Sequence, residues 1–342
     1  MLLMQAFHCS ILRAHKIHSS VNLTNSIVGA NGDEDPPVPI PNTEVKLISV
    51  ENTWRVTAWK DRAVPTQSVI HFESRFFCVL EENNKMKYQV LLKQIVQQYQ
   101  HILGENLVGI YLHGSAAFRC DTQESDIDFI VVVKREISQK QKEDLIRLLL
   151  DLSPNAPQKG FEMSVVLLDD CLHFQYPTPY QLHFSIAHQK QYQDNLSVYS
   201  QKMQGVDFDL AAHFTVIQRV GIVLWGDPIC SVFSSVPWEY YLDSIYRDVE
   251  DAPQQLTEDT VSVILNLCRV WAAYQEKMVC SKLQGGEWAL SRIPQMYQGN
   301  LRKILCAYRD GNKAEIYLSD SFRALAELLL EQICKVRAQI PY

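Results

Sequence analysis

The chain has 342 residues, of which 47% are apolar and 21% are charged, and its formal net charge is −7. This length and composition allow two domains with sizeable cores, and no apolar run approaches the roughly 18 residues that a membrane-spanning helix needs. The acidic balance, without a basic stripe, argues against nucleic acid as a partner and suits a small cationic substrate. We expect a monomer that binds neither membranes nor nucleic acids.

Nine cysteines are scattered along the chain without a CxxC motif or a paired spacing. An odd and dispersed set in a chain of this length indicates reduced thiols rather than a disulfide framework or a zinc site. We therefore expect a cytoplasmic protein.

Residues 1–85 form an N-terminal extension to which we assign no function. The stretch from Asn31 to Asn42 is rich in proline and acidic residues, which is typical of a linker. Apolar residues alternate between Val45 and Ala58, but the phase slips, so the hairpin signal is weak. The first residues lack the apolar core and cleavage site of a signal peptide. We expect this extension to be partly disordered.

A regular pattern begins at Met86. Apolar residues recur at helical spacing from Tyr88 to Leu103 and predict an amphipathic helix. Apolar runs predict strands over 107–112, 128–133 and 161–168, and Ser138 is the expected N-cap of a helix over 138–152. Residues 86–172 should therefore form a catalytic domain built on a small mixed sheet with flanking helices.

Residues with metal- and phosphate-binding chemistry stand at the strand ends of this domain. The first predicted strand runs into Gly114 and Ser115, where the glycine lets a phosphate approach the backbone and the serine can donate hydrogen bonds. The second follows Ser125 and carries Asp126 and Asp128, which share one face of an extended chain because they are two residues apart. Paired carboxylates of this kind suit Mg²⁺.

A third carboxylate, Glu162, heads the third predicted strand. We expect it to act as a general base and to touch a metal ion. Taken alone, Asp126 and Asp128 also fit a solvated loop or a helix cap, and Glu162 fits an exposed edge strand. Taken in order, the parts resemble the nucleotidyltransferase superfamily pattern of hG[GS], [DE]h[DE]h and a later carboxylate. The resemblance implies a pair of Mg²⁺ ions that bridge nucleotide phosphates.

The region after Asp170 has a different composition. An aromatic segment broken by prolines, from Phe174 to Tyr180, predicts a loop. A helix is predicted from Leu210 to Trp225, and further helical patterns cover 245–249, 259–277, 299–309 and 321–338. Residues 173–342 should thus form an α-helical bundle domain, which makes the whole chain an α+β protein.

An acidic run lies at the start of this helical region. Seven acidic residues accompany a single arginine between Glu239 and Asp259. The run fits a solvated helix face, and it equally fits a wall that attracts a cationic ligand by its focused potential. The sequence leaves both interpretations open.

The helical half resembles one known family. The segments that carry the resemblance are Val263–Trp271, Lys282, Glu287–Leu290, Arg292–Pro294 and Ala307–Tyr308. In order and spacing they are similar to the C-terminal domain of the aminoglycoside 3''-(9)-adenylyltransferases, which modify streptomycin and spectinomycin. The similarity runs from about Met86 to the C-terminus. It implies Mg-ATP as donor, transfer of AMP to a hydroxyl of the drug, and antibiotic resistance as the outcome.

Individual residues match the motifs of this family. The matched positions are Ser115, Ser125, Asp126 and Asp128 for the phosphates and metal, Glu162 for the base that faces the substrate, Arg269, Lys282 and Tyr308 for ATP, and Asp259 for the drug. The charges suit these roles, because Arg binds phosphate with two donors and Lys as a point charge. Streptomycin-binding members carry a Trp and an Asp where this chain has Glu250 and Gln255, so we expect spectinomycin to be favoured.

Two other functions remain open. One is a nucleotidyltransferase that modifies a protein or RNA, with the unmatched N-terminal extension as a docking module. The other is a catalytically silent nucleotide-binding protein, against which the three carboxylates argue because clustered like charges repel each other. Adenylylation of a small aminocyclitol is the function that we expect.

Overall fold

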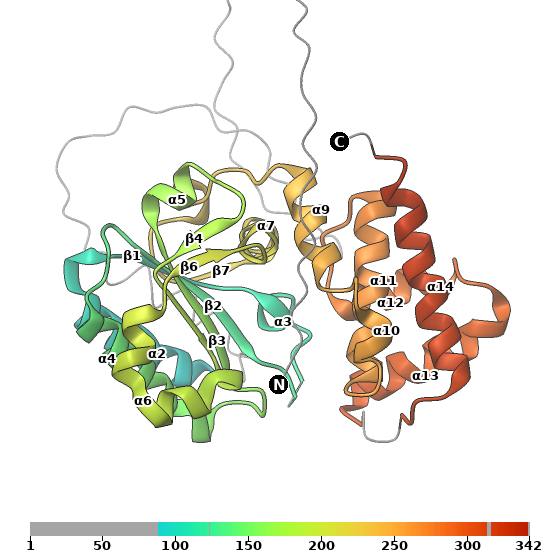
Figure 1. Ribbon diagram of the computed structural model, residues 1–342, viewed down its shortest axis with the longest axis horizontal. Helices are drawn as coiled ribbons and strands as arrows, with labels where there is room; N and C mark the ends of the chain where they lie inside the picture. Colours follow the sequence, from blue (N-terminus) through green and yellow to red (C-terminus); the bar gives the residue numbers. More distant parts are fainter. Residues whose placement is uncertain (1–87, 123, 313–315, 341–342) are drawn as a thin grey trace, which may run out of the picture. The chain divides into compact units, whose positions relative to one another are not determined.

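The computed structural model describes residues 88–122, 124–312 and 316–340. The expectations for residues 1–85 lie outside the described residues. The centre of the described part is a five-stranded sheet with the order β5-β3-β2-β1-β7 (Figure 1). Its strands are β1 (Leu107–Leu112), β2 (Ile127–Val133), β3 (Phe161–Leu167), β5 (Leu182–Ser185) and β7 (Ile222–Gly226).

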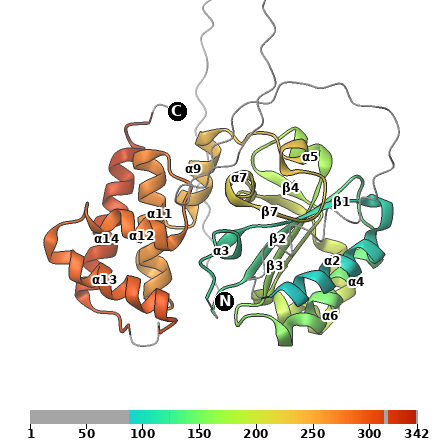
Figure 2. The same ribbon diagram turned by 180° about the vertical axis from the view of Figure 1, so that it is seen from behind.

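The sheet is mixed and covered by helices on both faces. β2 and β3 pair in parallel, whereas the other neighbours pair antiparallel, which confirms the predicted mixed sheet. All residues of β1 and β2 are buried, as their continuous apolar sequences require. One face packs against α2 (Gln89–Leu103), α4 (Gln139–Leu152) and α6 (Gln189–Lys202), and the other against α5 (Leu168–Leu172), α7 (Leu210–Val220) and α8 (Ile229–Val232) (Figures 1 and 2).

Helix α4 connects the two parallel strands. It begins at the predicted N-cap, where Ser138 and Gln141 form a capping box in which each side chain accepts a hydrogen bond from the other residue's backbone N–H. The crossover through α4 sets β3 beside β2 in a register that pairs Asp128 with Glu162. Two of the three predicted site carboxylates thereby come to lie on neighbouring strands.

The sheet continues beyond residue 172, where we expected the catalytic domain to end. β5 pairs with β3 and β7 pairs with β1, so both edges of the sheet come from later residues. The helix predicted from Leu210 to Trp225 stops at Val220, because Gly221 interrupts it and the β-branched and aromatic residues that follow join the sheet as β7. That helix prediction is wrong in its second part. We propose that the sheet domain extends to Gly226.

The remaining elements form a helical domain with its own hydrophobic core. Its helices are α9 (Trp238–Arg247), α10 (Ala252–Gln255), α11 (Thr260–Glu276), α12 (Lys282–Leu290), α13 (Gln295–Asp310) and α14 (Asp320–Arg337). Helix α11 packs against α12, α13 and α14. The expected helices over 259–277, 299–309 and 321–338 are therefore present, whereas α12, which carries two adjacent glycines, was not predicted. The α+β architecture with a helical C-terminal domain is confirmed.

Several short helices, strands and turns connect these elements. The short elements are α3 (Gly114–Ala117), the paired strands β4 (Thr178–Tyr180) and β6 (Gly205–Asp207), and 3-10 turns at Gly104–Asn106, Ser153–Asn155 and Ile186–His188. Within the described ranges, no helix is both long enough and apolar enough to cross a membrane. The cysteines of the described ranges are free thiols.

Candidate active site

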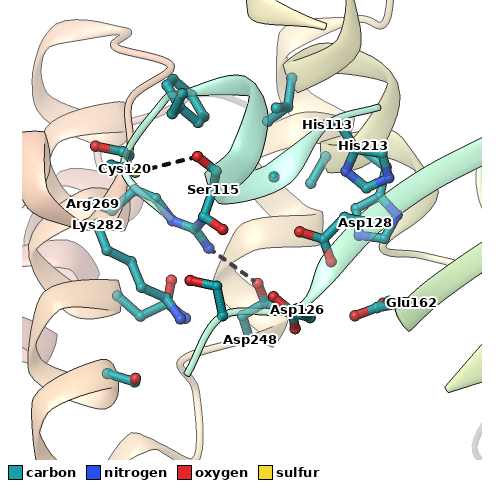
Figure 3. Close-up of a pocket in the computed structure, with 18 of the residues that line it drawn as sticks. His113, Ser115, Cys120, Asp126, Asp128, Glu162, His213, Asp248, Arg269 and Lys282 are labelled. Carbon is teal, nitrogen blue, oxygen red and sulfur yellow. Dashed lines mark hydrogen bonds and ion pairs between the residues drawn. The ribbon is translucent and has the colours of Figure 1, made fainter. Parts of the chain in front are cut away.

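Three carboxylates converge at the end of the sheet. Asp126 directly precedes β2, Asp128 lies on β2, and Glu162 lies beside it on β3. One ligand oxygen from each of these residues lies within 4.8 Å of the others (Figure 3). Carboxylate oxygens at this separation can share a hard divalent cation. The structure thus assembles the set of ligands predicted from the sequence.

Burial places these acids in an unfavourable environment when no cation is bound. Burial raises the pKa of Asp128 well above its usual range, and the neighbouring charges of Asp126 and Glu162 raise it further. Burial likewise raises the pKa of Glu162, against which His213 acts in the lowering direction. A divalent cation would relieve both the desolvation and the mutual repulsion. The donor set therefore fits a divalent metal ion.

The turn between β1 and α3 brings backbone close to this cluster. Gly114 has φ +61°, and a Cβ at this position would lie 1.7 Å from Asp128 Oδ2. Only glycine tolerates both the left-handed conformation and the close approach. The next residue, Ser115, points its hydroxyl toward the cavity (Figure 3). The hydroxyl of Ser125 accepts a hydrogen bond from Thr122 N at 2.9 Å and so braces the turn before Asp126.

The helical domain supplies the opposite wall of the same cavity. Arg269 comes from α11, Lys282 is the first residue of α12, and Tyr308 comes from α13. Burial raises the pKa of the Tyr308 hydroxyl to about 12. Helices α11 and α12 approach closely because residue 285 is glycine, where a Cβ would lie 2.6 Å from Arg269 Cα. The predicted nucleotide contacts therefore face the predicted metal ligands.

Several buried polar atoms in this cavity lack a protein partner. Ser115 Oγ, Asn266 Oδ1 and Arg269 Nε are buried and have no hydrogen-bond partner among the described residues, and all three residues line the cavity. Buried polar groups are normally hydrogen-bonded. Unused donors and acceptors that share one cavity indicate that a polar ligand binds there and forms hydrogen bonds with them.

Two histidines and two aspartates are among the cavity residues to which the sequence analysis assigned no role. These are His113, Asp209, His213 and Asp248. The His113 and His213 rings lie 4.6 Å apart between centroids, and burial, followed by the neighbouring His213, lowers the pKa of His113 well below its usual value. Burial and the charge of Asp248 raise the pKa of Asp209 to about 6. His113 stands directly before Gly114 in the predicted turn, and Asp248 lies in the acidic run of residues 239–259. Asp209 and His213 belong to no recognisable motif and reach the cavity through the packing of α7.

Asp259 occupies a different place from the other predicted residues. It caps α11, accepting a hydrogen bond from Ser262 N at 2.8 Å, and its carboxylate lies 3.8 Å from Lys159 Nζ. It lines a second cavity rather than the first. Lys159 and Glu124 line both cavities, so the two adjoin. The predicted drug contact is therefore set apart from the carboxylate cluster.

Two known families match the two domains that form the walls of the cavity. Residues 84–177 match the polymerase beta nucleotidyltransferase family, and residues 231–332 match the C-terminal domain of aminoglycoside adenylyltransferases. The chain is therefore similar to nucleotidyltransferases in its sheet domain and to aminoglycoside adenylyltransferases in its helical domain. The nucleotidyltransferase match contains the three carboxylates, and the C-terminal match contains Arg269 and Lys282. The expectation of an enzyme of the nucleotidyltransferase class is confirmed.

Individual adenylyltransferases show the same relationship at low identity. An aminoglycoside (3'') (9) adenylyltransferase from Klebsiella pneumoniae is 24% identical over 256 residues, which cover 73% of this chain and 96% of the relative. A spectinomycin 9-adenylyltransferase from Staphylococcus aureus is 26% identical over 221 residues, covering 62% of this chain and 81% of the relative. The nucleotidyltransferase match implies the use of a nucleotide and a divalent metal, and the Asp-Asp-Glu cluster could hold the metal.

A solved adenylyltransferase shares the fold. The crystal structure of the spectinomycin adenyltransferase AAD(9) from Enterococcus faecialis, with ATP and spectinomycin, superposes with a TM-score of 0.61 at 17% sequence identity. The match covers 72% of this chain and 99% of that chain. The two chains thus share a fold over almost the whole length of the solved structure.

Proposed function

We propose that this enzyme transfers AMP from Mg-ATP to a hydroxyl of an aminocyclitol or aminoglycoside antibiotic, releases pyrophosphate, and so confers resistance. One observation carries the proposal: three clustered carboxylates face Arg269 and Lys282 across a single cavity. Metal ligands opposite phosphate-binding cations are what nucleotidyl transfer requires. The names of the relatives supply the class of acceptor.

The carboxylates would hold the metal. Two Mg²⁺ ions bound by Asp126, Asp128 and Glu162 would supply neutralising charge to the triphosphate, which makes the α-phosphorus easier to attack. The Ser115 hydroxyl, buried and without a partner among the described residues, would donate to a phosphate oxygen. Arg269 and Lys282 would bind the outer phosphates, and Tyr308 lies where it can contact the nucleoside.

Glu162 would take the proton from the attacking hydroxyl. Burial raises its pKa, and a raised pKa makes the carboxylate a stronger base. Its position on β3, beside Asp128 and opposite the helical domain, leaves room for an acceptor on its other side. Glu162 would thus contact both the metal and the substrate.

The acidic side of the cavity favours a cationic acceptor. Asp209, Asp248 and Glu162 line it together, and each lies within electrostatic range of another. Such a wall attracts an ammonium group. Asp259 in the adjoining cavity would contact a more distant part of the drug. Glu250 and Gln255 stand where streptomycin-binding members carry Trp and Asp, and both are exposed. Because the chain lacks those two residues, we propose spectinomycin as the preferred acceptor.

The test is release of pyrophosphate by the purified protein with Mg²⁺ and ATP. The assay would include spectinomycin, streptomycin or no acceptor, and the variants Asp126→Asn and Asp169→Asn. We expect release with spectinomycin, its loss in Asp126→Asn, and no change in Asp169→Asn, because Asp169 is an exposed carboxylate on α5 outside the cavity. No release with either drug, while ATP still binds, would redirect the search to a protein or RNA acceptor.

A further inference from the structure

Asp248 is a carboxylate of the cavity to which no motif assigns a role. It follows the last residue of α9, and its side chain points toward Arg269 (Figure 3). The distance between Arg269 Nη2 and Asp248 Oδ2 is 3.7 Å, which is longer than a hydrogen bond. Within the described residues this is the one ion pair that Arg269 makes. The contact is therefore loose enough to be exchanged for a better one.

The guanidinium group of Arg269 has more donors than Asp248 uses. Its Nε is buried without a hydrogen-bond partner among the described residues, and the side chain is 24% exposed. A guanidinium group presents a fork of donors that matches a phosphate with two parallel hydrogen bonds. A triphosphate would satisfy donors that the carboxylate leaves unused.

Asp248 lies between cations and acids. The basic side chains within electrostatic range are Arg269, His213 and Lys282, and the acidic ones are Asp207, Asp209 and Glu162. Burial raises the pKa of Asp248, and Arg269 is the largest opposing influence. If Arg269 turned to bind a phosphate, Asp248 would lose its ion pair. Its carboxylate would then be free to bind another cation, beside the acids that line the acceptor side.

We propose that Asp248 couples the two substrates: it holds Arg269 in the nucleotide-free enzyme, the triphosphate displaces it, and the released carboxylate then binds an ammonium group of the acceptor. The inference rests on the proposed function, which supplies both the triphosphate and the cationic acceptor. Nucleotide binding is thereby opposed by an internal anion, and acceptor binding is strengthened by bound nucleotide. Thermodynamic linkage makes the two effects reciprocal.

Direct binding of Mg-ATP without acceptor tests the first half of this coupling. Isothermal titration calorimetry would compare the wild type with Asp248→Asn, which removes the charge and keeps the shape. We expect the variant to bind Mg-ATP more tightly, by about three- to tenfold, because the nucleotide no longer competes with a carboxylate. Asp248→Ser should behave similarly. Asp251→Asn, an exposed carboxylate of the same segment outside the cavity, should bind as the wild type does.

A double-variant cycle separates displacement from simple repulsion. If Asp248 acts by holding Arg269, then Asp248→Asn in an Arg269→Gln background has no effect on Mg-ATP affinity. An equal gain in both backgrounds would indicate repulsion through space and would overturn the inference. An unchanged affinity in both folded Asp248 variants would also overturn it. If the wild type fails to bind Mg-ATP, the proposed function fails together with the inference.

The second half is measured with the acceptor. At saturating Mg-ATP, we expect Asp248→Asn to raise the KM for spectinomycin by about tenfold with a smaller change in kcat, since an ion pair to the amine is lost. The two affinities would then move in opposite directions, which a merely structural defect does not produce. An unchanged KM for spectinomycin in a variant that binds Mg-ATP more tightly would refute the acceptor contact alone.

Discussion

Glu162 combines a buried position with neighbours of both signs. Burial and the nearby acids raise its pKa, and His213 opposes them. Asp128, its partner across the parallel strands, is 8% exposed and shares the same cluster. A carboxylate held among these groups can be both a metal ligand and a proton acceptor. Substitution by an amide separates the roles, because the shape stays while the basic oxygen is lost.

Replacing this base should abolish transfer while preserving the binding of nucleotide. For Glu162→Gln we expect Mg-ATP to bind within a fewfold of the wild type and AMP transfer to fall by at least about 10²-fold, the usual contribution of a general base. Pyrophosphate release and calorimetry measure the two quantities on the same sample. Turnover near the wild-type rate would remove Glu162 from the proposed mechanism.

Asp209 makes the stability of the protein depend on pH. Its pKa is raised to about 6 by burial and by Asp248, whereas an unfolded Asp loses its proton near pH 4. Between these values the folded chain holds a proton that the unfolded chain has released, so raising the pH through this window lowers the free energy of unfolding. The destabilisation caused by the ionised Asp209 is therefore fully present above about pH 6.

Asp209→Asn should therefore stabilise the protein selectively at higher pH. We expect the free energy of unfolding to rise by on the order of 1 kcal/mol above pH 6, after a discount for solvent screening. This gain in stability should vanish below pH 4. Urea denaturation at several pH values measures the difference. A gain of the same size at every pH would show that removal of the charge is not its cause.

Among the elements, α11 and α12 depend on an unusually close approach. Gly285 and Gly286 of α12 face α11, and a Cβ on Gly285 would collide with the Arg269 backbone, at 2.6 Å from Cα. The contact fixes Lys282 and Arg269 relative to each other, because they lie at the start of α12 and in the middle of α11. The positions of both cations therefore follow from helix packing.

Alanine substitutions at two helical glycines should act in opposite directions. Gly285→Ala forces α12 away from α11, so we expect a loss of about 1–3 kcal/mol of stability and weaker Mg-ATP binding. Gly299→Ala in α13 meets nothing within 4 Å, so the better helix propensity of alanine should add about 0.5–1 kcal/mol. Thermal unfolding and calorimetry check both. Equal responses would contradict the packing explanation.

The sequence predicted elements well where one pattern dominates. The continuous apolar runs of β2 and β3 and the periodic apolar residues of α2 led to the observed elements. The pattern was insufficient at residues 210–226, where a helix and a strand are both apolar and only Gly221 separates them. It also failed for α12, whose two glycines lower helix propensity and whose stability comes from contacts with α11.

At the scale of the whole molecule, the cavity joins residues from both halves of the described chain. The proposed metal ligands lie on or directly before strands of the sheet, and the proposed phosphate-binding cations lie on α11 and α12. A ligand that touches both walls stabilises both halves at once. Ligand binding and global unfolding should therefore be linked.

Mg-ATP should raise the melting temperature in a manner that depends on the carboxylates. At about 100 times its dissociation constant, a ligand adds roughly 2.7 kcal/mol, which corresponds to about 2–4 °C per kcal/mol for a domain of this size. Asp128→Asn should lose the dependence on Mg²⁺, and EDTA should abolish the shift in the wild type. A shift in the wild type that persists in EDTA would contradict metal binding by this cluster.

The candidate site was predictable only where its residues form a contiguous motif or match a family. Gly114 to Asp128 lie within one strand-turn-strand unit, so local geometry sufficed to place them. Arg269 and Lys282 required the resemblance, since isolated cations on helices are usually surface residues. His213 gave no signal, because only the packing of α7 brings it into the cavity, and Asp248 appeared only as one of seven acids in a run that fitted a solvated helix face equally well.

The parallel register of β2 and β3 has a consequence for how this enzyme tolerates change. Asp128 stands opposite Glu162 because backbone hydrogen bonds align the strands, and side chains alternate with a period of two. Shifting β3 by one residue would turn Glu162 to the opposite face and present Phe161 or Met163 to the cation. We expect insertions in the loops on either side of α4 to be tolerated as long as they leave this alignment intact. We therefore expect activity to depend on the alignment of β3 with β2. A shift of β3 by one residue should reduce activity more than many substitutions in the core would.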